Sequence, residues 1–249
     1  MQSTVIRTRL GPIPLWSPPG ALTSAKPLVL VITGAWAEAD DMMKTPAVVG
    51  PSWDAAVMRL PGNGTPALAE TSIAAWARAV SELVETAFAG RPVVLVGLSV
   101  GALVALGVRS AQVRRVLALE PPLVMSKLWP MAERLAARWR DDPAQRPVIE
   151  AVFGVKRHGH VERAWFGLFD GAPPVDVIVG DTPLYPQRAL AQFPSFVDAP
   201  EREWLAARPG VTLHVAPGAG HNIHVFAAET LRAVLLETLG KALAEPPLA

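Results

Sequence analysis

The 249-residue chain contains no cysteine. It therefore forms neither disulfides nor thiolate metal sites, and it uses no cysteine nucleophile. Charged residues are also few, at 18 %, and the net charge of +1 comes without a long run of one sign. This balance predicts no nucleic-acid partner and no electrostatic attraction to a membrane surface.

Long hydrophobic runs are missing as well. The first residues lack the apolar core of a signal peptide, and no later run is long enough to cross a bilayer, so we expect a cytoplasmic location. There is no G-K-[ST] string, and the G-N-G and G-A-G strings lack the third glycine and the following acid of a dinucleotide fingerprint. We expect no cofactor.

The residues that are present alternate short apolar runs with amphipathic helices. This pattern predicts an α/β protein with a mostly parallel sheet covered by helices on both faces. Residues 4–16 are expected to form an opening antiparallel hairpin, and residues 73–87 a helix capped by Thr71 or Ser72 and stopped near Gly90. The later strands are predicted at residues 27–32, 54–60, 92–96, 113–119, 175–179 and 211–215.

Residues 124–174 interrupt the alternation. They are rich in tryptophan and arginine and indicate a small helical insertion, a candidate lid, between a first core segment at 1–123 and a second at 175–249. Helical patterns are predicted at residues 128–140, 148–153 and 161–169.

The string G-L-S-V-G at residues 97–101 matches G-x-S-x-G. It directly follows an apolar strand and opens a helix, which is the setting of a nucleophile elbow. The turn is sharp, and a Cβ at Gly97 or Gly101 would clash across it. We therefore predict that Ser99 is a catalytic nucleophile exposed above the sheet edge.

A histidine stands where a serine nucleophile needs its base. His221 follows the strand at 211–215 and precedes the last helix, in the chain order Ser…acid…His. It is predicted to take the Ser99 proton and return it to the leaving group. A metal role for His158 and His160 is not expected, because no third ligand is spaced nearby and both lie in a basic loop.

Two residues compete to be the acid of the triad. Asp181 follows the strand at 175–179, where the acid usually lies, although it comes only one residue after Gly180. Glu120 ends the strand at 113–119, whose loop opens at the same edge. We favour Asp181 and keep Glu120 as the alternative, since the acid is recognised by geometry rather than by position.

Acyl transfer also requires two donors aimed at the developing oxyanion. The amide of Val100 is one candidate, because it directly follows the nucleophile. The loop Thr33-Gly34-Ala35-Trp36 supplies the other, with the Ala35 amide as the expected donor.

Taken together, these motifs resemble the α/β-hydrolase family across nearly the whole chain. Its members share strings similar to T-G-A-W (33–36), L-P-G-N-G (60–64), G-L-S-V-G (97–101) and G-A-G-H-N (218–222). The resemblance implies an eight-stranded sheet, a cofactor-free triad and a lid over the acyl pocket between the sixth and seventh strands. T-G-A-W is similar to the H-G-A-W of plant esterases and hydroxynitrile lyases, with Thr33 in place of histidine. Related haloalkane dehalogenases place the acid at the end of the sixth strand, where Glu120 stands, but their nucleophile is aspartate.

We therefore expect a serine hydrolase that cleaves a small-molecule carboxylic ester of small or medium size. Two alternatives remain open at this level. The same triad could serve carbon–carbon hydrolysis or lyase chemistry, or the chain could be a non-catalytic ligand-binding homologue.

Overall fold

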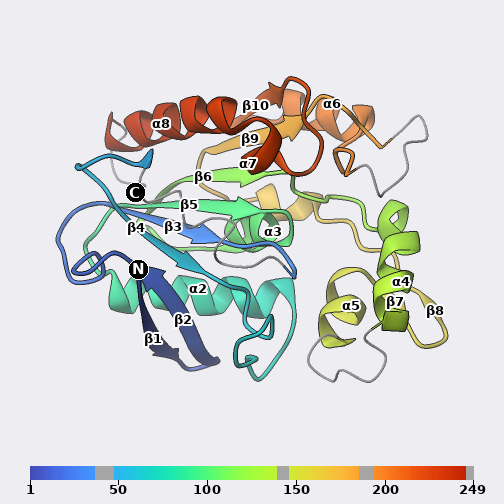
Figure 1. Cartoon of the computed structure of the whole chain (residues 1–249), viewed down its shortest axis with the longest axis horizontal. Coiled ribbons are helices and arrows are strands. Elements are labelled where there is room, and N and C mark those ends of the chain that lie inside the picture. The colour runs from blue at the N-terminus through green and yellow to red at the C-terminus, as the bar shows by residue number, and fades with distance from the viewer. Residues whose placement is uncertain (37–47, 139–145, 185–192, 245–249) are drawn as a thin grey trace.

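A computed structural model describes residues 1–36, 48–138, 146–184 and 193–244. Eight strands form one sheet: β1 (Gln2–Thr8), β2 (Gly11–Ser17), β3 (Leu28–Ile32), β4 (Asp54–Met58), β5 (Val93–Leu98), β6 (Val113–Leu119), β9 (Val175–Gly180) and β10 (Val211–Ala216). Their order is β1-β2-β4-β3-β5-β6-β9-β10 (Figure 1). β2 pairs antiparallel with β1 and β4, and every other neighbouring pair is parallel. The predicted fold class is confirmed.

Helices cover both faces of this sheet (Figure 1). The helices of the described residues are α2 (Ile73–Ala87), α3 (Val100–Gly107), α4 (Trp129–Arg138), α5 (Arg146–Val152), α6 (Ala199–Ala207), α7 (Ile223–Phe226) and α8 (Ala228–Ala244), of which α4 and α5 lie beyond the strand ends rather than on a face. The predicted helix at 73–87 is confirmed as α2, where the Ser72 hydroxyl accepts a hydrogen bond from the Ala75 amide at 3.0 Å. None of the helices in the described ranges is long and apolar enough to span a membrane.

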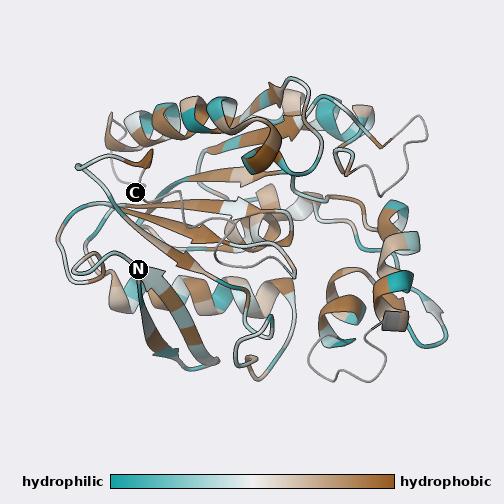
Figure 2. Cartoon of the chain, viewed as in Figure 1, coloured by the Kyte–Doolittle hydropathy of each residue, from teal (hydrophilic) through white to brown (hydrophobic). Residues whose placement is uncertain are grey.

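Alternate residues of the central strands fill two separate cores. In β3, Leu28, Leu30 and Ile32 pack with residues of α2 and α3, whereas Val29 and Val31 pack with residues of α8 on the other face. Because both faces are covered, the two central strands β3 and β5 carry no polar side chain (Figure 2). Polar functional side chains are therefore expected at the ends of these strands rather than on their faces.

The segment between β6 and β9 covers residues 124–174, for which an insertion is predicted. It holds α4, α5, the short hairpin of β7 (Val155–Lys156) and β8 (Gly159–His160), and two 3₁₀ turns, η2 (Ser126–Leu128) and η3 (Phe166–Phe169). Figure 1 places α4 and α5 beyond the carboxyl ends of the parallel strands.

The helix predicted at 161–169 is wrong except for the turn of η3. The Val161 amide instead donates to Gly154 O at 2.8 Å, and the Trp165 amide donates to Leu123 O at 2.9 Å. Backbone donors used in this way are not available to a helix, so contacts to distant segments override the local apolar spacing.

A buried ionic cluster ties the last three strands of the sheet to α8. Asp176 in β9 is fully buried. Its carboxylate lies 3.0 Å from Arg115 Nη2, 3.1 Å from His214 Nε2, 3.1 Å from Thr238 Oγ1 and 3.4 Å from Lys241 Nζ. Burial alone raises the pKa of Asp176, but the hydrogen bond from His214 and the charges of Arg115 and Lys241 outweigh burial and hold the pKa below its ordinary value of 3.8.

Replacing Asp176 by asparagine is expected to lower the free energy of unfolding at pH 7 by about 3–5 kcal/mol, because Arg115 stays buried without its counter-ion. A carboxyl whose pKa is lower in the folded state stabilises the fold above its unfolded pKa, and this contribution disappears as the pH falls through the folded value. The difference between the two proteins should therefore shrink below about pH 4. Urea unfolding at pH 7 and pH 3 measures both effects.

Asp170→Asn is the matched control, because this exposed carboxylate pairs with Arg208 at the surface. It should change the free energy of unfolding by about 1 kcal/mol or less. Equal stability of the Asp176 and Asp170 variants at pH 7 would contradict the assignment.

Candidate active site

The predicted site residues all follow parallel strands that are neighbours in the sheet. Ala35 follows β3, Ser99 follows β5, Glu120 follows β6, Asp181 follows β9 and His221 follows β10. These five strands are adjacent in the order β3-β5-β6-β9-β10. The carboxyl ends of parallel strands meet at one edge, which is where ligands bind in open α/β sheets.

Ser99 occupies the turn between β5 and α3, as the G-x-S-x-G string predicts. Its backbone has φ 55° and ψ −120°, and its amide donates to Leu119 O at 2.8 Å. A Cβ on Gly97 would lie 2.4 Å from Gly101 O, and one on Gly101 would lie 2.3 Å from Ile32 O. Only glycine permits this approach of the backbone, so the predicted strand–turn–helix geometry is present.

Two candidate oxyanion donors lie beside this turn. Val100 is the first residue of α3, so its amide has no acceptor within the helix. The loop after β3 passes close to the nucleophile, because a Cβ on Gly34 would lie 3.3 Å from Ser99 Cβ. Ala35 is the next residue of that loop. The structure thus brings both predicted donors to the elbow.

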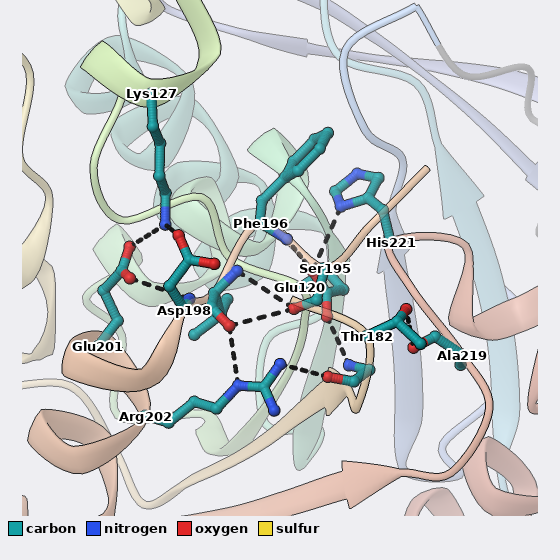
Figure 3. Close-up of polar contacts among 12 residues, drawn as sticks. Glu120, Lys127, Thr182, Ser195, Phe196, Asp198, Glu201, Arg202, Ala219 and His221 are labelled. Atoms are coloured by element: carbon teal, nitrogen blue, oxygen red, sulfur yellow. Dashed lines mark hydrogen bonds and ion pairs between the residues drawn. The ribbon is translucent and has the colours of Figure 1, made fainter. Parts of the chain in front are cut away.

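His221 meets Glu120. Its Nδ1 lies 3.4 Å from Glu120 Oε2, and only 12 % of the His221 side chain is exposed (Figure 3). This separation is that of an ion pair rather than of a short hydrogen bond, and Nδ1 has no hydrogen bond to any described residue. Catalytic hydrogen bonds are often long in unliganded enzymes and shorten when the substrate binds.

The Glu120 carboxylate is fully buried and held by backbone donors. Oε1 accepts from the Gly180 amide at 2.6 Å, and Oε2 accepts from the Phe196 amide at 2.8 Å. The Phe196 ring also stacks on the His221 imidazole, with 3.9 Å between ring centroids. The Glu120 carboxylate and the His221 imidazole therefore both contact Phe196.

The favoured acid, Asp181, does not take this place. Its amide donates to Ala216 O at 3.1 Å, and its side chain is exposed, with no hydrogen bond or ion pair to His221 in the part of the chain that is described. No side chain fits at position 180 itself, because a Cβ on Gly180 would lie 2.2 Å from Ala219 O. The backbone of the loop before His221 fills that space, and Glu120 reaches the imidazole from the neighbouring strand.

Backbone strain is concentrated at this edge. Within the described residues, φ is positive at four non-glycine residues: Trp36 (61°), Ser99 (55°), Glu120 (50°) and Phe193 (47°). Phe193 is part of the same site, because its carbonyl accepts the His221 amide at 2.9 Å. Such conformations cost on the order of 1–3 kcal/mol each and persist where the surroundings over-determine them, which is typical of functional sites.

Sequence reasoning alone does not identify several neighbours of the site. Phe196 acts through its peptide N–H and its ring, and no side-chain motif marks it. Trp36 and Phe153 stack with 5.3 Å between centroids, which joins the loop after β3 to the insertion. The T-G-A-W string marks Trp36 in the sequence, but not its contact with Phe153, which lies more than a hundred residues away.

His160 contacts a glutamate and a tryptophan. His160 Nε2 lies 2.9 Å from Glu133 Oε1, and the imidazole stacks on Trp129 with 4.4 Å between centroids. Among the described residues, no group of three histidine, aspartate or glutamate side chains is arranged to hold a metal ion.

Comparisons with known proteins agree with the fold. The chain is similar to carboxylesterase CesB from Bacillus subtilis, at 16 % identity over 96 % of this chain and 91 % of that one, with a TM-score of 0.66. It is also similar to a thermophilic esterase from Thermogutta terrifontis, at 19 % identity over 97 % and 99 % of the two chains, with a TM-score of 0.65.

An E-2-(acetamidomethylene)succinate hydrolase matches at 16 % identity over 96 % of this chain and 100 % of that one, with a TM-score of 0.61. No curated protein sequence matches the chain. The model of the alpha/beta hydrolase family, however, matches residues 28–233. This match, together with the fold, confirms the prediction of a hydrolase: the chain belongs to the alpha/beta hydrolase family.

Proposed function

We propose that this hydrolase cleaves a small or medium carboxylic ester through an acyl-enzyme on Ser99. The observation that carries the proposal is the pairing of His221 Nδ1 with the buried Glu120 carboxylate at 3.4 Å, on the strand edge that holds the Ser99 elbow. A carboxylate at Nδ1 leaves Nε2 as the nitrogen that serves the nucleophile. Glu120, rather than Asp181, is the acid of this proposal.

The reaction follows from these roles. Ser99 Oγ attacks the ester carbonyl carbon while its proton passes to His221 Nε2. The amides of Val100 and Ala35 donate to the resulting oxyanion. When the tetrahedral intermediate collapses, the carbon–oxygen bond to the alcohol breaks, and His221 gives that oxygen its proton. Water, deprotonated by His221, then attacks the acyl-enzyme. The carboxylic acid product leaves as His221 returns the proton to Ser99 Oγ.

Glu120 supports both proton transfers. It accepts from Nδ1–H of His221, which orients the imidazole, and its negative charge stabilises the imidazolium that forms in each half-reaction. Its full burial strengthens that interaction, because the surroundings screen charge less than water does.

The insertion at residues 124–174 serves in this proposal as the lid of the acyl pocket. Its support is the stacking of Phe153 on Trp36, which follows the candidate oxyanion donor Ala35. Ester substrates also agree with the names of two structural neighbours, a carboxylesterase and an esterase. Cleavage of an ester yields one acid and one alcohol, and analysis of the products distinguishes it from carbon–carbon cleavage.

A fluorophosphonate probe tests the nucleophile without knowledge of the substrate. We expect one covalent adduct on the wild-type protein, measured by intact mass, and none on Ser99→Ala. The Ser3→Ala variant is the control, since Ser3 is an exposed residue of β1, and it should label like the wild type. A folded wild-type protein that forms no adduct would contradict the proposal and favour a ligand-binding role.

A further inference from the structure

The acid of the proposed triad depends on two chain segments that are distant in sequence. One is the end of β9, where the Gly180 amide donates to Glu120 Oε1 at 2.6 Å. The other precedes α6, where the Phe196 amide donates to Glu120 Oε2 at 2.8 Å. The carboxylate can keep its place against His221 only while these two segments keep theirs.

A single side chain also binds both of these segments. Arg202, in α6, donates from Nη2 to Gly180 O at 2.5 Å and from Nε to Val197 O at 2.8 Å (Figure 3). Arg202 therefore binds the carbonyl of Gly180, whose amide donates to Glu120. It also binds the carbonyl of Val197, the residue after Phe196. A planar guanidinium suits this task, because its donors diverge in a fixed fork and it keeps its charge at every physiological pH.

Resting on the proposed function, we propose that Arg202 is a positioning residue of the triad, which holds Glu120 at His221 by clamping the two segments that donate to it. Arg202 touches neither the nucleophile nor the base. Its effect passes through the peptide groups of Gly180 and Val197, so it sets the distance between Glu120 Oε2 and His221 Nδ1. Small displacements at such a site reduce catalysis strongly, since the reacting groups must be aligned to a fraction of an ångström.

The helix that carries Arg202 is itself anchored to the insertion. Asp198 and Glu201 form a capping box at the start of α6. Lys127, from η2, places Nζ 2.9 Å from Asp198 Oδ2 and 2.5 Å from Glu201 Oε1. All three of these side chains are more than nine-tenths buried. These ion pairs hold the start of α6, and with it Arg202, against the proposed lid.

The test compares Arg202→Met, Arg202→Lys and the matched control Arg208→Met. Arg208 follows the same helix, but it pairs with Asp170 and lies over the Trp204 ring, away from Glu120. Each variant is measured for its rate of fluorophosphonate labelling, for kcat and KM on an ester that the wild type cleaves, and for its thermal midpoint. The measurements are repeated well below the lowest midpoint, so that only folded protein is compared.

For Arg202→Met we expect the rate of fluorophosphonate labelling and kcat to fall roughly 10- to 100-fold. This is the range found when a group that orients a metal-binding side chain is removed. KM should change by less than about twofold, because the clamp does not bind substrate. Arg202→Lys, which can reach one carbonyl but not two, should recover part of the lost rate, and Arg208→Met should retain the wild-type rate.

A folded Arg202→Met with wild-type labelling and kcat would overturn the proposal, as would a rise in KM alone. A loss of rate equal in Arg202→Met and Arg208→Met would overturn it too, since that result marks a general effect of altering α6. If Arg202→Met does not fold, Arg202→Lys decides by the same criteria. The proposed function is tested independently of Arg202, because it fails if Ser99 of the wild-type protein forms no fluorophosphonate adduct.

Discussion

Ser99→Ala is expected to lower kcat for ester hydrolysis by on the order of 10⁶-fold, and His221→Ala by a similar factor. Alanine at position 99 has no oxygen to form the acyl-enzyme, and without the imidazole no group at this edge takes the Ser99 proton. The two losses should not add in the double variant, because serine and histidine act as one unit. Steady-state rates on a short-chain aryl ester measure this.

Both variants should remain folded, with thermal midpoints near the wild-type value. The Ser99 side chain makes no capping hydrogen bond to α3, so alanine removes no support from that helix. Ser3→Ala should keep full activity. A Ser99→Ala rate within tenfold of the wild type, after contaminating hydrolases are excluded by a second purification, would refute the assignment.

Glu120→Gln is expected to lower kcat by about 10³- to 10⁴-fold, the size of effect seen when a triad carboxylate becomes an amide. Both oxygens of Glu120 face donors: Gly180 at Oε1, and Phe196 with His221 at Oε2. An amide NH₂ therefore meets another donor in either orientation. The variant loses the charge that stabilises the imidazolium, and it also loses the acceptor that fixes the tautomer of His221.

Asp181→Asn is the matched carboxylate control. Asp181 lies at the same sheet edge, but its side chain is exposed, so we expect kcat to change by less than about twofold. Measuring kcat and the thermal midpoint of both variants separates catalysis from folding. If Asp181→Asn lost activity and Glu120→Gln retained it, the role of the acid would pass to Asp181.

Local sequence signals were sufficient for the elbow and for the fold class. The run before Gly97 is apolar at every position, which is typical of a parallel strand buried on both faces. The two glycines around Ser99 allow a turn that no other residue could make, so the motif and its geometry are inseparable. The cap of α2 at Ser72 and the alternation of strands and helices are equally local, and each was predicted correctly.

The acid could not be chosen locally. Glu120 and Asp181 both follow parallel strands of the same sheet. The strand that precedes Asp181 favoured it, although its short spacing from Gly180 did not. What decides between them is the segment around Phe196, which covers Glu120 and donates to it, together with the loop before His221, which fills the space beside Gly180. These contacts join residues up to a hundred positions apart, and no periodicity in the sequence encodes them.

The sequence by itself determined the strand–turn–helix of the nucleophile, the order of serine and histidine along the chain, and the parallel sheet that supports them. These depend on short-range sterics and on hydrophobic periodicity, which are properties of neighbouring residues. Only the tertiary structure decided which carboxylate meets His221, which backbone carbonyls Arg202 binds, and why residues 161–165 are not helical. These outcomes depend on hydrogen bonds and buried charges between distant segments, whose partners exist only after the sheet has assembled.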